Sequence, residues 1–539
     1  MAEPRAELPR QRTLSRSRQG GPDLRAARVV ALGLLVSKPT GYLRDALLAA
    51  RFGTGRAMDA YSLASTTVMA VFDILGTPLQ RILVPVLVAA RARRGRPGLE
   101  ATSRAVLGAA TVAAAVLSLG ILVGAPAAAR ILAGPGALGA EVADLLRWLS
   151  LLPLLLTWAA YATAWLQADK HFLLPAFTGL PLDLGIIGFV LVAGRHGVLA
   201  AAWGLTIGTL GQFLLQWPGL RRYGHRLRAE GPLQRDPGLR ATARMAPPLL
   251  ISVLVVQAAT LLEQGLAARL AVGTVAALAY ARRVLDLPAA LFTLPITTVA
   301  LPRLAVLSAE RDPAPARRAL QNTAWPLAAG LAPAALLLGL LRQPLAAALY
   351  EHGAFGAGST RAMGLALLGL APGVFTWGLQ QLLRTYFYAR QQPRVPMLWD
   401  AVALAVNAAV DLGTYRTLHQ LGLALGWSIG AGVAWVGMAH AARGDGHAVR
   451  WREAAQITGA LAVCALITLG TAALLGHPHL RPWLGALVVL AASGSAGLVA
   501  YGGSLWALGA GHLLEALAGR LRGEAVGPAA LGAREAPPR

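Results

Sequence analysis

The stretch ALGLLVSKPTGYLRDALLAARFG, residues 31–53, has the length of a membrane-spanning helix but carries charges in its middle. Most of its residues are apolar or small, yet Lys38, Arg44 and Asp45 lie within it. Scales based on membrane insertion assign each such residue a cost of about 2.5–3.5 kcal/mol at the centre of a bilayer. We therefore expect these side chains to line a cavity inside the protein and to take part in its function.

The composition of the whole chain is that of a membrane protein. Its 539 residues are 56% hydrophobic and only 14% charged, whereas soluble domains carry about 25% charged residues. Apolar segments of about 20 residues alternate with Arg-rich or Gly/Pro-rich breaks, which is typical of helical spans and not of β-barrels. We expect an all-α polytopic fold of about fourteen spans, at 29–50, 60–90, 105–125, 142–167, 172–194, 197–220, 245–268, 275–301, 319–341, 361–388, 395–415, 421–441, 453–475 and 483–508.

The net charge of +24 is distributed as a topology signal. Most Lys and Arg residues fall in alternate connections, and the other connections hold few. The positive-inside rule then predicts that both termini are cytoplasmic, and the basic segments would also attract anionic membrane lipids. The first 28 residues lack the pattern of a cleavable signal peptide. Because the charge follows the connections, we do not expect nucleic acid as a partner.

An internal repeat divides the predicted spans. LAARFGTGRAMDAY (48–61) is similar to LAARLAVGTVAALAY (266–280), and Pro85 and Pro302 lie in two further similar segments at nearly the same offset. The repeat predicts two six-helix lobes in the same orientation, an arrangement found in transporters. The expected regions are a basic tail (1–28), an N-lobe (29–220), a basic linker (221–244), a C-lobe (245–441), two further helices (442–510) and a C-terminal tail (511–539).

The charged residues inside the predicted spans indicate an anionic ligand. Lys38 and Asp45 are seven residues apart and share a helix face, with Arg44 beside it, and Pro39 and Gly41 predict a kink or unwound turn between them. Guanidinium groups pair with phosphate oxygens, and lysine acts as a point charge. Internal ion pairs, or side chains reaching the membrane interface, are the alternative explanation. Further charges of this kind are Asp73, Arg81, Arg282, Arg283 and Asp286.

A second polar set is acidic. Glu263 lies in the span 245–268, and Asn407 and Asp411 are four residues apart on one face of the span 395–415. Oxygen ligands of this kind suit a sodium ion, and a proton is the other candidate; a polar cluster that joins helices is equally compatible. The sequence holds no hydrolase or nucleotide-binding motif, so we expect no enzyme. The single cysteine, Cys464, excludes an intrachain disulfide.

Several stretches together resemble the MurJ (MviN) lipid II flippases of the multidrug/oligosaccharidyl-lipid/polysaccharide exporter superfamily. GYLRDALLAARFGTGRAMDAYSLA (41–64) is similar to the first two helices of that family, and the segment 272–304 is similar to its seventh and eighth. YEHGAFGAGST (350–360) and LLRTYFYARQQPRVP (382–396) match later motifs in the expected order. The resemblance implies a bacterial inner-membrane flippase for lipid II, without a cofactor, that works beside cell-wall synthesis proteins.

The resemblance also assigns roles to residues. It places substrate-binding positions at Lys38, Arg44, Asp59 and Arg283, supported by Asp45, Arg81, Arg282 and Asp286, and a candidate sodium site at Glu263, Asn407 and Asp411. Two features depart from the family: Lys38 replaces an arginine, and Phe72 and Asp73 stand where it has paired arginines. The alternatives are a flippase for another lipid-linked saccharide, a cation-coupled multidrug exporter and an inactive membrane scaffold.

Overall fold

The computed structural model describes residues 37–223, 236–309, 312, 314–442, 450–476 and 481–521, and these ranges contain helices and no strand. Residues 37–52 form the first helix. The first half of the chain continues with α2 (Arg56–Ala133), α3 (Ala137–Leu149), α4 (Leu152–Ala168), α5 (Leu173–Ala176), α6 (Gly179–Ala193), the short η1 (Gly194–His196) and α7 (Val198–Arg222).

The second half contains more helices than the repeat predicts. They are α8 (Pro237–Ala267), α9 (Thr274–Pro288), the π-helical turn η2 (Ala289–Thr293), α10 (Leu294–Ser308), α11 (Ala314–Leu340), α12 (Arg342–Tyr350), α13 (Ala357–Ala389), α14 (Arg394–Thr414), α15 (Gln420–Ala442), α16 (Trp451–Leu475), α17 (Pro482–Ala507) and α18 (Gly511–Leu521). The short α12 was not expected. Helix α18 lies in the segment predicted as a C-terminal tail and packs on α10, α11 and α17.

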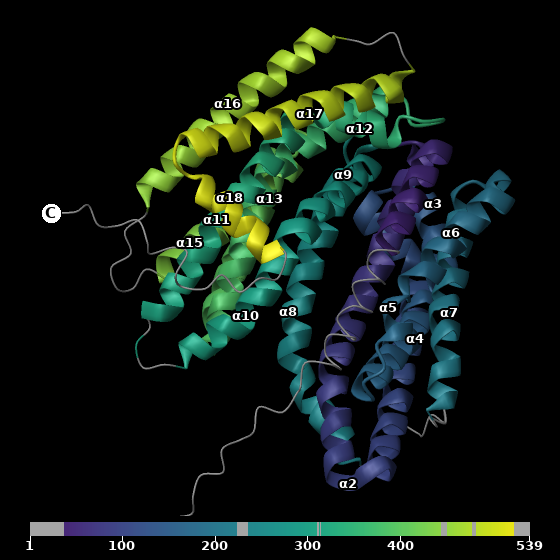
Figure 1. Cartoon of the computed structure of the whole chain (residues 1–539). Coiled ribbons are helices and arrows are strands. Elements are labelled where there is room, and N and C mark those ends of the chain that lie inside the picture. The colour runs from purple at the N-terminus through teal and green to yellow at the C-terminus, as the bar shows by residue number, and fades with distance from the viewer. Residues whose placement is uncertain are drawn as a thin grey trace, which may run out of the picture.

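The helices are long and apolar enough to cross a membrane many times. Ten helices in the described ranges meet this description, or eleven if α3 and α4, which are bent by 42°, form one broken span. Helix α2 has 78 residues but reverses at Gly95 (φ 65°), where Figure 1 shows it turning back on itself. The connection expected at 91–104 is therefore helical on both sides of one glycine. The multi-pass class is confirmed, and the number fourteen stays a prediction.

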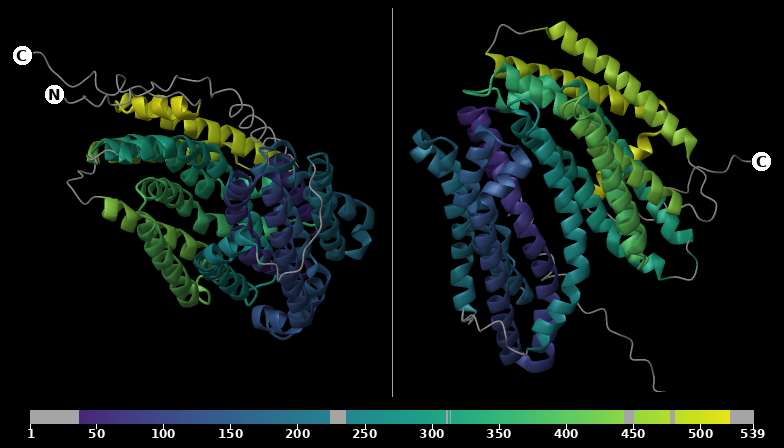
Figure 2. Two further views of the ribbon diagram at one scale, coloured as in Figure 1. Left: turned by 90° about the horizontal axis from the view of Figure 1, so that it is seen from below. Right: turned by 180° about the vertical axis from the view of Figure 1, so that it is seen from behind.

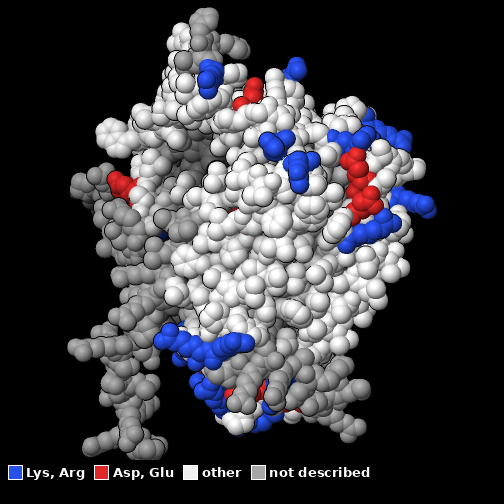
Figure 3. Space-filling view, turned by 90° about the vertical axis from the view of Figure 1, so that its right-hand side faces the viewer, with Lys and Arg blue, Asp and Glu red and all other residues white. Residues whose placement is uncertain are grey.

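The outer surface of the helices is apolar. Leu191, Val192, Leu466 and Val499 are among many large aliphatic side chains that are exposed. Figure 3 shows that Lys, Arg, Asp and Glu gather toward the two ends of the face in view, with uncharged side chains between them. Such a surface suits lipid as the solvent, since contiguous apolar patches of this extent are rare on soluble monomers.

The helices form two groups, with α8 between them (Figures 1 and 2). Helices α2–α7 pack together on one side, while α11, α13 and α15 form the centre of the other. Helices α16 and α17 pair along the outside of the second group, and α8 packs against α2. One buried apolar cluster contains residues of both groups, for example Leu63 and Leu146 from the first and Val275 and Phe355 from the second. The two groups therefore share a core.

The start of α8 is fixed to the turn of α2 by one carboxylate. Asp236 caps α8 by accepting hydrogen bonds from the amides of Gly238 (2.7 Å) and Leu239 (3.2 Å). The same side chain accepts from Arg94 Nη1 and Thr102 Oγ1, both at 2.9 Å. Asp236 is buried, so its removal would leave Arg94 and two helix amides without their acceptor.

We expect Asp236→Ala to destabilise the fold more than an ordinary cap substitution does. Loss of a cap costs about 0.5–2 kcal/mol, and here the charged partner Arg94 is lost as well. Asp312→Ala is the matched control, because the exposed Asp312 accepts a hydrogen bond from the amide of Ala314 at the start of α11. Thermal unfolding of the purified protein in detergent should show the larger drop in Tm for Asp236→Ala. Equal drops would mean that the contacts with Arg94 and Thr102 contribute nothing.

Candidate functional site

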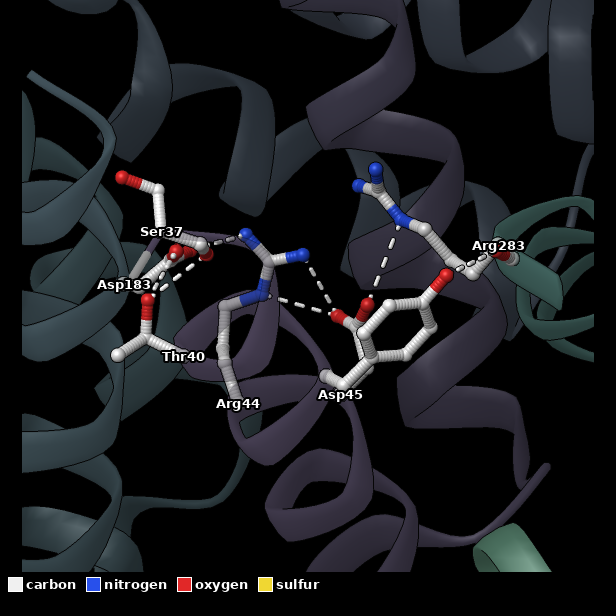
Figure 4. Close-up of polar contacts among 7 residues, drawn as sticks. Ser37, Thr40, Arg44, Asp45, Asp183 and Arg283 are labelled. Carbon is white, nitrogen blue, oxygen red and sulfur yellow. Dashed lines mark hydrogen bonds and ion pairs between the residues drawn. The ribbon is translucent and has the colours of Figure 1, made fainter. Parts of the chain in front are cut away.

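Arg44 and Asp45 of the first helix form a compact ion-pair cluster with residues of α6 and α9 (Figure 4). Arg44 donates from Nε and Nη2 to Asp45 Oδ1 at 2.9 and 2.7 Å, and from Nη1 to Asp183 Oδ1 at 2.7 Å. Its side chain is only 11% exposed. Two carboxylates thus compensate one buried guanidinium, which makes burial of this charge tolerable.

Asp183, on α6, is the member of this cluster that the sequence analysis missed. Its second oxygen accepts a hydrogen bond from Thr40 Oγ1 at 3.3 Å. Gly41 faces this carboxylate, and a Cβ at that position would make an ordinary contact of 3.5 Å with Asp183 Oδ2. The available signal was a lone carboxylate in the apolar stretch GLPLDLGIIGF, because a single ionisable residue within a span indicates a functional site.

Arg283, on α9, lies on the other side of Asp45. Its Nε is 3.5 Å from Asp45 Oδ2, and its side chain is 53% exposed. The hydroxyl of Tyr42 donates to the backbone carbonyl of Arg283 at 3.0 Å, which ties α9 to the first helix. Asp45 therefore bridges one buried and one accessible arginine, and Arg283 is the one open to a ligand.

The other predicted residues near this cluster have different surroundings. Lys38 is exposed, and within the described ranges it makes no ion pair. Residues 37–52 form an uninterrupted helix, so the unwound turn expected at Pro39 and Gly41 is absent. Asp286 is exposed on α9.

In helix α2, Phe72 and Asp73, the two residues that depart from the family pattern, both contact other parts of the protein. Asp73 Oδ2 accepts a hydrogen bond from Gln257 Nε2 of α8 at 2.8 Å. Phe72 is partly buried and packs against the shared core. Arg81 is exposed, two turns further along α2. The Asp73 carboxylate is thus hydrogen-bonded to a neutral amide of the neighbouring helix.

Asp59 joins the two groups of helices. It is buried, and its Oδ2 and Oδ1 accept hydrogen bonds from the amides of Gly273 (2.5 Å) and Ala276 (2.8 Å). These amides belong to the first turn of α9, whose positive end favours a carboxylate. The resemblance assigned Asp59 to substrate binding; in this structure it caps α9, the helix that carries Arg283.

Three glycines bring the chain into close backbone contact beside Asp59. Gly53, Gly273 and Gly353 have φ of +60°, +94° and +59°. A Cβ on them would lie 2.5 Å from Ala354 O, 2.3 Å from Thr54 O and 2.2 Å from Ala50 O, respectively. The amide of Ala354 also donates to Ala50 O at 2.7 Å. We call the contacts of these three glycines the glycine seal; it closes one end of the interface between the predicted lobes.

A positively charged side chain of the protein, that of Arg282, lies within the acidic set of Glu263, Asn407 and Asp411. Arg282 Nη2 donates to Glu263 Oε1 at 2.5 Å and also contacts Oε2. Asn407 Nδ2 lies 3.3 Å from both carboxylate oxygens of Asp411, and both residues are buried. Asp411 is within electrostatic range of Glu263 and Arg282. The three predicted residues thus belong to one neighbourhood, which Arg282 shares; a sodium ion there stays a prediction.

Comparison with known proteins identifies the relatives of this chain. The family described as lipid II flippase MurJ matches residues 48–485. The lipid II flippase MurJ of Burkholderia cenocepacia is 28% identical over 424 residues, which cover 76% of this chain and 81% of that protein. A probable lipid II flippase MurJ of Rhizobium tropici is also 28% identical, over 84% of this chain and 86% of that protein.

Solved structures agree on the fold. A lipid II flippase MurJ in an inward closed conformation superimposes with a TM-score of 0.75 at 17% identity, covering 89% of this chain and 99% of that one. An inward-facing multidrug resistance transporter of the MATE family reaches 0.64 at 14% identity, over 80% of this chain and 98% of that one. Because the family match spans most of the sequence, including the first helix from Leu48, all of α9 and the acidic set, the chain belongs to the lipid II flippase MurJ family.

Proposed function

We propose that this protein moves lipid II, an undecaprenyl-diphosphate-linked peptidoglycan precursor, from the inner to the outer leaflet of the bacterial inner membrane. The observation that carries the proposal is the cluster of Arg44, Arg283, Asp45 and Asp183 within the membrane-spanning region. Membership of the family supports it, since the relatives are described as lipid II flippases. No bond is made or broken, so the protein is a transporter and not an enzyme.

The charge balance of the cluster suits a diphosphate. Without ligand, two arginines and two aspartates compensate one another, and the contact between Arg283 and Asp45 is the longest of the three at 3.5 Å. A diphosphate would take Arg283 from Asp45 at small cost, because charge-assisted bonds to phosphate are short and strong. Lys38, exposed on the same helix face as Asp45, would add a point charge.

The lipid tail has a matching surface next to Arg283. An apolar groove of about 630 Å³ is lined by Val284, Leu287, Leu291, Leu338 and Leu341 together with residues of α17. Leu287 is four residues after Arg283 and therefore follows it on one face of α9. A substrate with its diphosphate at Arg283 would place its isoprenoid chain along Leu287 and Leu291, in contact with the bilayer.

Alternating access would use the glycine seal as its outer gate. With cytoplasmic termini, as the positive-inside rule predicts, the seal lies at the external end of the protein and would close that side of the charged cluster. Release of the headgroup outward would require the contacts of Asp59, Gly53 and Gly353 with the other lobe to separate. The membrane potential, worth about 2.3 kcal/mol per charge per 100 mV, would supply the driving force.

A second candidate is a flippase for another lipid-linked saccharide. It is favoured by Phe72 and Asp73, which place an aromatic ring and a carboxylate where the family has two arginines. Growth of a MurJ-depleted bacterium that expresses this protein would support lipid II as the substrate. Failure to restore growth, together with normal insertion and flipping of a different undecaprenyl-diphosphate-linked glycan in vesicles, would support the second candidate.

We expect Arg44→Ala to abolish complementation without preventing membrane insertion. The substitution leaves Asp45 and Asp183 buried beside each other without their cation, and breaking such a buried pair typically costs about 3–5 kcal/mol. Colony formation of the depleted strain should therefore be lost. Arg416→Ala is the control, because Arg416 is exposed and its side chain donates to the hydroxyl of the adjacent Tyr415. Full growth with Arg44→Ala would contradict a role for Arg44 in transport.

A reversible cross-link can test the outer gate. Thr54 Oγ1 and Ser359 Oγ are 2.7 Å apart across the glycine seal, so cysteines at both positions could form a disulfide. In a Cys464→Ser background, we expect oxidised Thr54→Cys/Ser359→Cys protein to stop flipping in vesicles and reduced protein to regain it. Each single variant is the control. Undiminished flipping by the fully cross-linked protein would exclude opening at this end.

A further inference from the structure

Glu263 receives its counter-ion from a neighbouring helix. The carboxylate is buried on α8, and the guanidinium of Arg282 on α9 contacts both of its oxygens. A buried carboxylate is stable in its charged form only with a cation or several hydrogen-bond donors beside it. Arg282 supplies both, so Glu263 has no need of a diffusible ion.

The guanidinium is also held from its other side. Its Cζ lies 5.9 Å from the centroid of the Trp427 ring on α15, within the distance of a cation–π contact. Only 32% of the Arg282 side chain is exposed. Beside it, Arg282, Asp286, Trp377 and Trp427 line a cavity of about 260 Å³. The positive charge thus has a defined position, with open space next to it.

Asp411 alone offers a poor set of ligands for a small cation. It is 1% exposed, and the group that Asn407 turns toward both of its oxygens is the amide Nδ2, which is a donor and cannot bind a cation. On the remaining side, α15 passes so closely that a Cβ on Gly426 would lie 2.1 Å from Asp411 Oδ1. Hard cations of this size need several oxygens around one point.

We propose that the guanidinium of Arg282 is a tethered replacement for the cation, so that the cluster of Glu263, Asn407 and Asp411 binds no sodium ion in this protein. Arg282 stays with the chain throughout the transport cycle and neutralises Glu263 without an ion from solution. The neighbouring residue, Arg283, pairs with Asp45 at the cluster of the first helix. Adjacent positions of α9 therefore connect the two charged clusters, and no sodium gradient contributes to the cycle.

The experiment measures ion binding and needs no lipid substrate, so its result is independent of the proposed function. Full-length protein in nanodiscs would be tested for saturable ²²Na⁺ binding and for Tm in NaCl, KCl and choline chloride at equal ionic strength. We expect the unmodified protein to show no saturable binding and equal Tm values in the three salts. Saturable sodium binding that Asp411→Asn removes would overturn the proposal.

Removal of the tether should create a sodium site. We expect Arg282→Ala to lower the Tm in KCl and to recover roughly 2–4 °C in NaCl, with saturable ²²Na⁺ binding that the added Glu263→Gln abolishes. Guanidinium chloride at millimolar concentration should compete for the same site. Arg282→Lys, which keeps a tethered charge, and the neighbour control Arg283→Ala should gain no sodium binding.

Two outcomes of the variants would contradict the proposal. One is Arg282→Ala protein that folds but binds no sodium, since the guanidinium would then not occupy a cation position. The other is sodium binding by Arg282→Lys equal to that of Arg282→Ala. If Arg282→Ala does not fold, the measurements on the unmodified protein and on Asp411→Asn still decide between the tethered and the diffusible cation.

Discussion

The buried guanidinium of Arg44 is the constraint on which the central part of the structure depends. An unpaired charge at this depth would be costly, so the first helix must lie where Asp45 and Asp183 can both reach it. Asp183 fixes α6 beside the first helix, and Asp45 turns its second oxygen toward Arg283 of α9. One charge thus determines how three helices from both groups meet. The arrangement leaves Arg283 as the accessible cation at their junction.

Helix α9 connects the charged cluster to the glycine seal, to Glu263 and to the apolar groove. Its amino-terminal amides are capped by Asp59 at the glycine seal. About two turns further along the helix, Arg282 contacts Glu263 and Arg283 contacts Asp45. Leu287 follows on the groove beside α11 and α17. Any opening of the seal that moves the start of α9 must therefore change the position of both arginines. The proposed gate and the proposed headgroup site would thus be coupled through one helix and not through a long chain of contacts.

Much of this could be predicted from the sequence, because the bilayer imposes strict rules on composition. Apolar length and charge distribution indicated the multi-pass helical fold, and the charges in the first span marked the site. Asp183 was missed because its span is otherwise featureless and its partner lies 139 residues away in the chain. The pairing of Arg282 with Glu263 was equally invisible, since helical spacing places residues on a face but does not tell which helix that face meets. The break at Gly95 is different: the Gly and Pro residues of RRGRPGL (93–99) indicated a connection there, and the structure makes it with one positive φ between two helical segments.

The two arginines of α9 illustrate how adjacent residues in a membrane helix can serve different ends. Successive positions differ by about 100° around the helix axis, so one side chain enters the second group of helices while the next faces the first. Arg282 is held between a carboxylate and an indole ring, and Arg283 is half exposed with one long contact. The contacts of Arg282 favour a lasting ion pair with Glu263. The single long contact of Arg283 favours replacement of Asp45 by an incoming anion. Arg282 would keep α9 in a fixed position, while Arg283 would bind a diphosphate reversibly. A transporter requires both properties of the helix that lies between its gate and its substrate.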